Sequence, residues 1–107
     1  MRVLIVHPSF YMYGGAELVI VRLSQYLTGH NVKVDILTSS MIYSVRRELR
    51  KNKDVRVIIP KSALVGDPFV ELSDWIKSYY PKYDIINFHN HPAEIMLYPE
   101  KHKSVWN

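Results

Sequence analysis

The sequence contains no cysteine and no long apolar run. Because none of its 107 residues is cysteine, disulfides, thiolate catalysis and cysteine-ligated zinc sites are excluded. The longest apolar stretches have only the length of a β-strand, and the apolar core of a signal peptide is missing, so we expect no membrane-spanning helix and no secretory leader. A chain without cysteine suits a reducing compartment, and we expect a cytoplasmic protein.

Several nucleotide- and metal-binding signatures are also missing. No G-x-G-x-x-G follows the first apolar segment, and no Gly-Lys-Ser/Thr sequence indicates a P-loop. The second apolar segment, 32–38, has no acid at its carboxyl end for a ribose hydroxyl, since Asp35 stands in its middle. His89 and His91 have the spacing of metal ligands, but no third ligand accompanies them. We therefore expect no dinucleotide cofactor and no metal.

Length and apolar content predict a single globular domain. A chain of 107 residues is too short for two domains, and a hydrophobic content of 48% is ordinary for a folded protein. Apolar periodicity predicts strands that alternate with helices. The expected strands are 2–6, 32–38, 55–59, 84–89 and the start of a fifth at 103–107. We expect a Rossmann-like, doubly wound parallel sheet of order 3-2-1-4-5 in a three-layer α/β/α arrangement.

The helices between these strands have their own boundary signals. A first helix over 16–27 is stopped by Gly29 and Asn31, and Ser39 or Ser40 can cap a second. Asp67–Pro68 is typical of a helix start, and a short fourth helix follows residue 92. The expected buried stripes are Ile42, Val45 and Leu49 in the second helix and Phe69, Leu72, Ile76 and Tyr79 in the third.

Two glycines stand at the start of the first helix. Gly14 and Gly15 leave backbone N–H groups uncovered at the positive end of the helix dipole, which favours a phosphate or a sugar diphosphate. The alternative is that they only make a tight turn into the helix. Glu17 follows in the first turn, where an acid also complements the dipole.

Two histidines end strands that the expected topology brings together. His7 ends the first strand and His89 ends the fourth, so both belong at the carboxyl-end crevice of the sheet. There they can contact a ligand, or they can fix the loops through hydrogen bonds. The apolar run 10–13 precedes the glycines and is either a contact surface or a lid over the domain's own core.

The net charge of +4 is concentrated in one segment. Its basic residues are Arg46, Arg47, Arg50, Lys51 and Lys53. They form either a solvated helix face or a contact with an anionic surface, such as a phosphorylated substrate or the acidic lipid at the inner face of a membrane. Nucleic acid is disfavoured because aromatic side chains are not interleaved with the charges.

The chain resembles the N-terminal domain of family 4 (GT-B) glycosyltransferases over essentially its whole length. The resemblance is carried by the first strand into His7, by Gly14-Gly15-Ala16-Glu17, and by the segment 83–90, which ends in His89-Asn90. Asn87 departs from a histidine that is frequent at its position in the family. The sequence contains no Asp-x-Asp pair of the metal-dependent GT-A class.

This resemblance implies a role for each matched residue. Gly14, Gly15, Ala16 and Glu17 would form the loop that approaches the diphosphate and sugar of a nucleotide-sugar donor. His7, His89 and Asn90 would line the acceptor side of the cleft. The family holds its donor mainly through a C-terminal domain that is not in this sequence, and its active-site histidine lies just after the fifth strand. The resemblance therefore implies a partial domain that is inactive alone, with no catalytic residue of its own.

Two further expectations complete the sequence-based interpretation. A non-catalytic α/β module that binds phosphate or another protein is the alternative to a transferase. We also expect the chain to self-associate, because a strand around Val105 and Trp106 would present an unpaired edge and an apolar surface.

Overall fold

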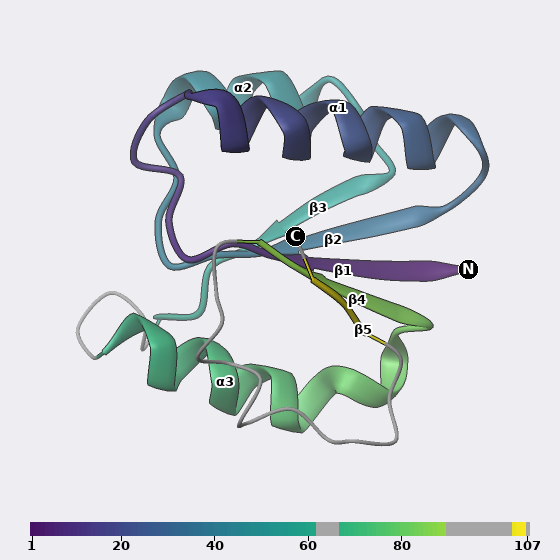
Figure 1. Ribbon diagram of the computed structural model, residues 1–107. Helices are drawn as coiled ribbons and strands as arrows, with labels where there is room; N and C mark the ends of the chain where they lie inside the picture. The colour runs from purple at the N-terminus through teal and green to yellow at the C-terminus, as the bar shows by residue number, and fades with distance from the viewer. Residues whose placement is uncertain (62–66, 90–103, 107) are drawn as a thin grey trace.

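The protein is an α/β domain with a Rossmann-like fold, as the sequence predicted. The computed structural model describes residues 1–61, 67–89 and 104–106 (Figure 1). Along the chain its elements are β1 (Arg2–Val6), α1 (Gly15–Gly29), β2 (Lys33–Leu37), α2 (Tyr43–Arg50), β3 (Val55–Ile58), α3 (Pro68–Tyr79), the 3₁₀ turn η2 (Tyr80–Lys82), β4 (Ile85–Phe88) and β5 (Ser104–Trp106). No described helix is both long and apolar enough to cross a bilayer.

The strands form one parallel sheet with β1 near its centre. The order is β3-β2-β1-β4-β5, and every neighbouring pair runs parallel. In the register of the central pairs, Val6 lies opposite Leu37 on β2 and Phe88 on β4. The carboxyl ends of β1, β2 and β4 therefore meet at one edge, from which the loops into α1 and α2 depart.

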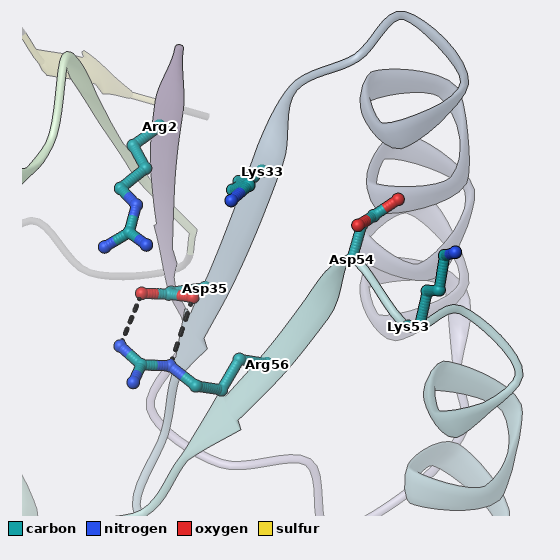
Figure 2. Close-up of a pocket in the computed structure, with 6 residues that line it drawn as sticks. All are labelled: Arg2, Lys33, Asp35, Lys53, Asp54 and Arg56. Carbon is teal, nitrogen blue, oxygen red and sulfur yellow. Dashed lines mark hydrogen bonds and ion pairs between the residues drawn. The ribbon is translucent and has the colours of Figure 1, made fainter.

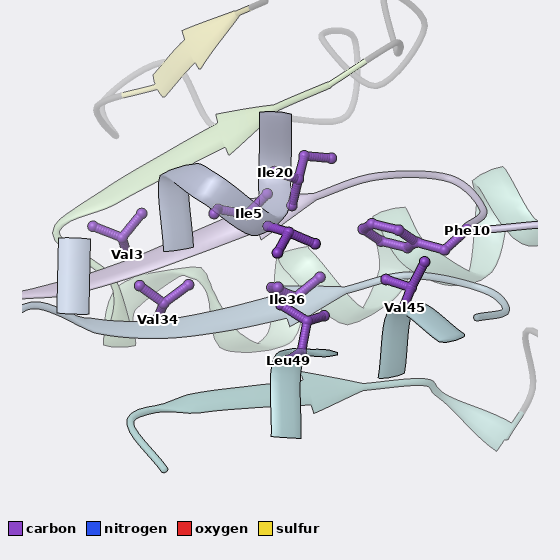
Figure 3. Close-up of a cluster of buried hydrophobic side chains, with 9 residues drawn as sticks. Val3, Ile5, Phe10, Ile20, Val34, Ile36, Val45 and Leu49 are labelled. Atoms are coloured by element: carbon purple, nitrogen blue, oxygen red, sulfur yellow. The ribbon is translucent and has the colours of Figure 1, made fainter. Parts of the chain in front are cut away.

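Helices cover both faces of the sheet, with α1 and α2 on one face and α3 on the other (Figure 1). Successive strand residues alternate between the faces. Val3 and Ile5 therefore pack under α1 and α2, whereas Leu4 and Val6 pack under α3. The first core also contains Phe10, Ile20, Val21, Val34, Ile36, Val45 and Leu49 (Figure 3). Burying a side chain of this size contributes about 1.5–3 kcal/mol.

The first helix runs two residues past its predicted end at Leu27, and of the two predicted stop residues Asn31 makes the turn, whereas Gly29 is still helical. Asn31 has φ 63° and is the one non-glycine residue with a positive φ in the described ranges. Asparagine tolerates this left-handed conformation, which turns the chain out of α1. The Val32 amide then donates to the Leu27 carbonyl oxygen and directs the chain into β2.

The predicted cap of the second helix is wrong. The N-cap of α2 is Ile42, without a side-chain hydrogen bond, and not Ser39 or Ser40. Both hydroxyls instead join the loop after β2 to the loop after β1: Ser39 Oγ donates to the Pro8 carbonyl oxygen (2.5 Å), and Ser40 Oγ lies 2.6 Å from Ser9 Oγ. The stripe predicted for α2 is confirmed, since Ile42, Val45 and Leu49 all pack in the first core.

The predicted stripe of the third helix is partly wrong. Leu72 and Ile76 are buried as expected, but Tyr79 is 42% exposed and stacks on Trp75, with ring centroids 4.5 Å apart. The packed side continues into η2 through Tyr80, which lies four residues after Ile76 and is partly buried against the same core. The side chain of Phe69 lies outside the described part of the structure.

Several other predictions fall outside the described residues. They are Asn90, His91, the short helix after residue 92 and the side chains of Val105 and Trp106.

A buried carboxylate on β2 joins this strand to β3 and to the segment between η2 and β4 on the α3 face. Asp35 accepts two hydrogen bonds from Arg56 on β3, at 2.8 and 3.3 Å, and one from the Tyr83 hydroxyl at 2.6 Å. Burial, followed by the hydrogen bond to Asp35, raises the pKa of Tyr83 well above its usual range. The phenol is therefore a proton donor at neutral pH.

Replacing the Tyr83 hydroxyl should destabilise the fold measurably. Tyr83→Phe removes one hydrogen bond to a buried carboxylate, and we expect the free energy of unfolding to fall by about 1.5 kcal/mol in urea titrations. Tyr79→Phe is the matched control on an exposed ring, where we expect a change within about 0.5 kcal/mol. Equal unfolding midpoints for the two variants would show that the Asp35 contact contributes nothing.

Candidate functional site

The parallel topology brings the two histidines to the same edge of the sheet. His7 and His89 each follow directly on the paired residues Val6 and Phe88. The His89 amide donates to the Val6 carbonyl oxygen (2.9 Å), and the His7 amide donates to the Leu37 carbonyl oxygen (3.1 Å). Both side chains are buried. This edge is where parallel α/β sheets bind their ligands.

Glu17 connects this edge to the start of α1. Its side chain is only 8% exposed, although it lies in the first turn of the helix. One carboxylate oxygen accepts a hydrogen bond from His7 Nε2 (2.8 Å), and the other accepts one from the Gly14 amide (2.9 Å). The carboxylate therefore holds the end of β1 and the N-terminus of α1 together.

The charge of Glu17 is stabilised where it lies. Burial raises the pKa of the carboxyl group, but hydrogen bonds from His7, from the Gly14 amide and from its own amide outweigh that effect and lower the pKa. An ionised carboxylate can only accept hydrogen bonds, so His7 Nε2 carries the shared proton. Glu17 is thus a fixed negative charge beside the positive end of the helix dipole.

The opposite ring nitrogen of His7 has no hydrogen-bond partner among the described residues. His7 Nδ1 is buried and makes no hydrogen bond within the described part of the chain. The ring packs edge-on against Phe10, with centroids 4.6 Å apart and planes at 72°. A buried polar atom without a partner is costly, and a polar group of a ligand could satisfy it.

His89 is held in its neutral form. Burial, and after it the nearby His7, lower the pKa of His89 to about 4. At neutral pH this ring is therefore uncharged, with one donor and one acceptor nitrogen.

The glycine loop leaves an open backbone surface. Among the described residues, the amides of Gly15 and Ala16 have no hydrogen-bond acceptor. A Cβ at Gly15 would meet no atom within 4 Å, and its φ lies outside the left-handed region. Neither packing nor backbone conformation requires a glycine there. A Cβ at Gly14, in contrast, would lie 3.2 Å from Glu17 Oε1.

The apolar run before the glycines divides between core and surface. Phe10 is fully buried and belongs to the first core, whereas Tyr11 is 73% exposed. Met12 and Tyr13 are exposed as well. The run therefore both covers the domain's own core and presents apolar side chains beside Gly14.

The predicted basic segment does not form one face. Lys51 pairs with Glu48 (3.0 Å), while Arg46 and Arg50 lie beside β3. Lys53 lies with Arg2 on the other side of the sheet. No group of three metal-ligating side chains occurs in the ranges that the structure describes.

Two contacts at the site and in the sheet were not predicted from the sequence. The first is the link from Glu17 to His7, for which the available signal was an acid three residues after a glycine N-cap. The second is the contact of Asp35 with Arg56, signalled by a charge in the middle of an apolar strand.

No protein-family model matches the chain, and no curated protein sequence is significantly similar to it.

The buried histidine predicts how stability depends on pH. The pKa of His89 is about 4 in the folded protein and near its usual 6.5 when unfolded, so acid protonates the unfolded state first. The free energy of unfolding should therefore be highest above pH 6.5 and should fall between pH 6.5 and 4. The lowered pKa of Glu17 adds a second loss only below about pH 4.5.

Urea titrations at pH 7, 5.5 and 4 check this expectation. His89→Gln should flatten the decline between pH 6.5 and 4, while His30→Gln on the exposed end of α1 should leave it unchanged. An identical decline in wild type and His89→Gln would contradict the assignment.

Proposed function

We propose that this chain is the acceptor-side half of a glycosyltransferase that moves a sugar from a nucleotide-sugar donor to an acceptor. The proposal includes the finer architecture that the resemblance implies, an N-terminal GT-B domain of three layers. The observation that carries it is Gly15, because neither the conformation nor the packing of the described structure needs a glycine at that position. A ligand that must approach the backbone closely is a physical reason for a glycine there.

The loop is suited to a diphosphate. The Gly15 and Ala16 amides have no partner among the described residues, and they lie at the positive end of a helix of 15 residues. Donors fixed before the reaction stabilise charge on a leaving group without reorganising, which is usually a large contribution to catalysis. Glu17 and His7 act as positioning residues in this proposal, since they hold the loop at the edge of the sheet.

The acceptor would approach the same carboxyl ends of the strands from the side of β4. His89, neutral at pH 7, would line this side through its imidazole ring. The exposed Tyr11 and Tyr13 in the loop between β1 and α1 offer flat apolar surface to a sugar ring. The donor nucleotide would be held mainly by a second domain, so the 107-residue chain alone should transfer no sugar.

Backbone amide shifts test the proposal directly. In ¹H–¹⁵N NMR titrations with UDP-glucose, GDP-mannose and inorganic pyrophosphate, the Gly15 and Ala16 resonances should shift in a saturable way. Gly15→Val should weaken this binding at least about tenfold, because the side chain would cover the amides, whose loss costs up to ~3 kcal/mol in comparable sites.

Gly29→Val is the matched control. A Cβ at Gly29 also meets no atom within 4 Å, and this position lies at the other end of α1. This variant should bind as wild type does. Equal shifts with pyrophosphate and with nucleotide sugars would favour the non-catalytic phosphate-binding module. Unshifted Gly15 and Ala16 amides at millimolar concentrations of all three probes would contradict both functions.

A further inference from the structure

Strand β3 is an edge of the sheet with a free hydrogen-bonding side. Within the described residues it pairs with β2 and with no other strand. The Val34 amide donates to the Asp54 carbonyl oxygen, and the Thr38 amide donates to that of Ile58. In a parallel pair, every second residue of a strand turns both its N–H and its C=O toward the same neighbour. Asp54 and Ile58 face β2, so Val57, the residue before Ile58, turns its N–H and C=O away from β2.

A basic hollow flanks this edge on the α2 face. It has a volume of about 210 Å³. Its lining combines the apolar Leu49, Val55 and Val57 with the basic Arg46 and Arg50 of α2. Neither of these two arginines has an ion-pair partner among the described residues.

A second basic hollow flanks the same edge on the opposite face. It has a volume of about 200 Å³ and lies over the amino-terminal halves of β1, β2 and β3 (Figure 2). Its lining carries four cations and two carboxylates: Arg2, Lys33, Lys53 and Arg56 with Asp35 and Asp54. Asp35 is already paired with Arg56, so the remaining cations outnumber the remaining carboxylate by three to one.

The two hollows meet at one residue. Arg56 lines both of them, although its guanidinium is paired with Asp35 and its side chain is 58% exposed. A strand added beside β3 would send alternate side chains to opposite faces of the sheet. Its side chains would therefore reach the α2 hollow and the opposite hollow in turn, while its backbone met Val57.

We propose that β3 is a docking edge for an extended acidic segment of a partner protein, which adds to the sheet as a strand. Main-chain hydrogen bonds would supply affinity, and carboxylates in consecutive positions would supply specificity for the two basic hollows. A second copy of β3 is disfavoured as the occupant, because cations would then oppose cations across the new pair.

This geometry differs from that of a membrane contact. A flat anionic surface would engage Arg47 and Lys51, which are one α-helical turn apart and do not line either hollow. An added strand instead needs Arg46 and Arg50, which lie on the side of α2 that faces β3. The two occupants therefore predict different effects for neighbouring arginines.

The test is an NMR titration with a nine-residue peptide whose central glutamates are consecutive and flanked by valine and threonine. Binding should shift the amides of residues 55–59 and slow hydrogen exchange at the Val57 amide. Arg46→Glu and Arg50→Glu should each weaken binding about tenfold, or ~1.4 kcal/mol. Arg47→Glu is the matched control from the same helix and should change affinity by less than about twofold.

Two control peptides separate strand addition from plain charge attraction. A glutamine version should not bind, because the carboxylates are gone, and a version with a central proline should bind poorly, because one ladder donor is lost. Unchanged binding of the proline peptide would overturn the proposal. A second contradicting result has two parts: Arg47→Glu and Arg46→Glu weaken peptide binding equally, and the protein pellets with vesicles of acidic phospholipid in a salt-sensitive way. Together these results would assign the basic residues to a membrane contact.

Discussion

The buried carboxylate of Glu17 is the contact on which the candidate site depends. Burying a charge is costly unless it is hydrogen-bonded, and each carboxylate oxygen of Glu17, whose side chain is 8% exposed, accepts a hydrogen bond, one from His7 and one from the Gly14 amide. The same two bonds fix where α1 begins relative to β1. Because the Gly14 amide already donates to Glu17, the amides at the start of α1 that have no acceptor among the described residues are those of Gly15 and Ala16.

A second buried carboxylate organises the other half of the sheet. Asp35 is satisfied by Arg56 and Tyr83 and so joins β2 to β3 beneath the α3 face. The two buried acids, Glu17 and Asp35, are thus each hydrogen-bonded to groups from other elements. Most of the remaining charged side chains are basic and lie at the surface. Two hollows lined by basic side chains lie beside β3, while the carboxyl ends of the strands face the backbone amides at the start of α1.

The fold was predictable because β1 is apolar at four successive positions, and Asp67–Pro68 starts α3 by local chemistry alone. Parallel pairing also predicted that His7 and His89 meet, since both follow paired strand ends. The Ser39 and Ser40 hydroxyls were misassigned because loops distant in the sequence compete for them. The inward orientation of Glu17 could not be predicted from the sequence either, because it depends on tertiary contacts and not on helix propensity.

The most direct test of this account is a double-mutant cycle between His7 and Glu17. His7→Phe keeps an aromatic ring against Phe10, and Glu17→Leu removes the carboxylate while retaining bulk. Unfolding free energies of the two single variants and the double variant give the coupling. The account predicts a coupling of about 1.5–3 kcal/mol, as for a buried hydrogen bond to a charged group. Losses that add to within about 0.5 kcal/mol would show that the two residues do not act together.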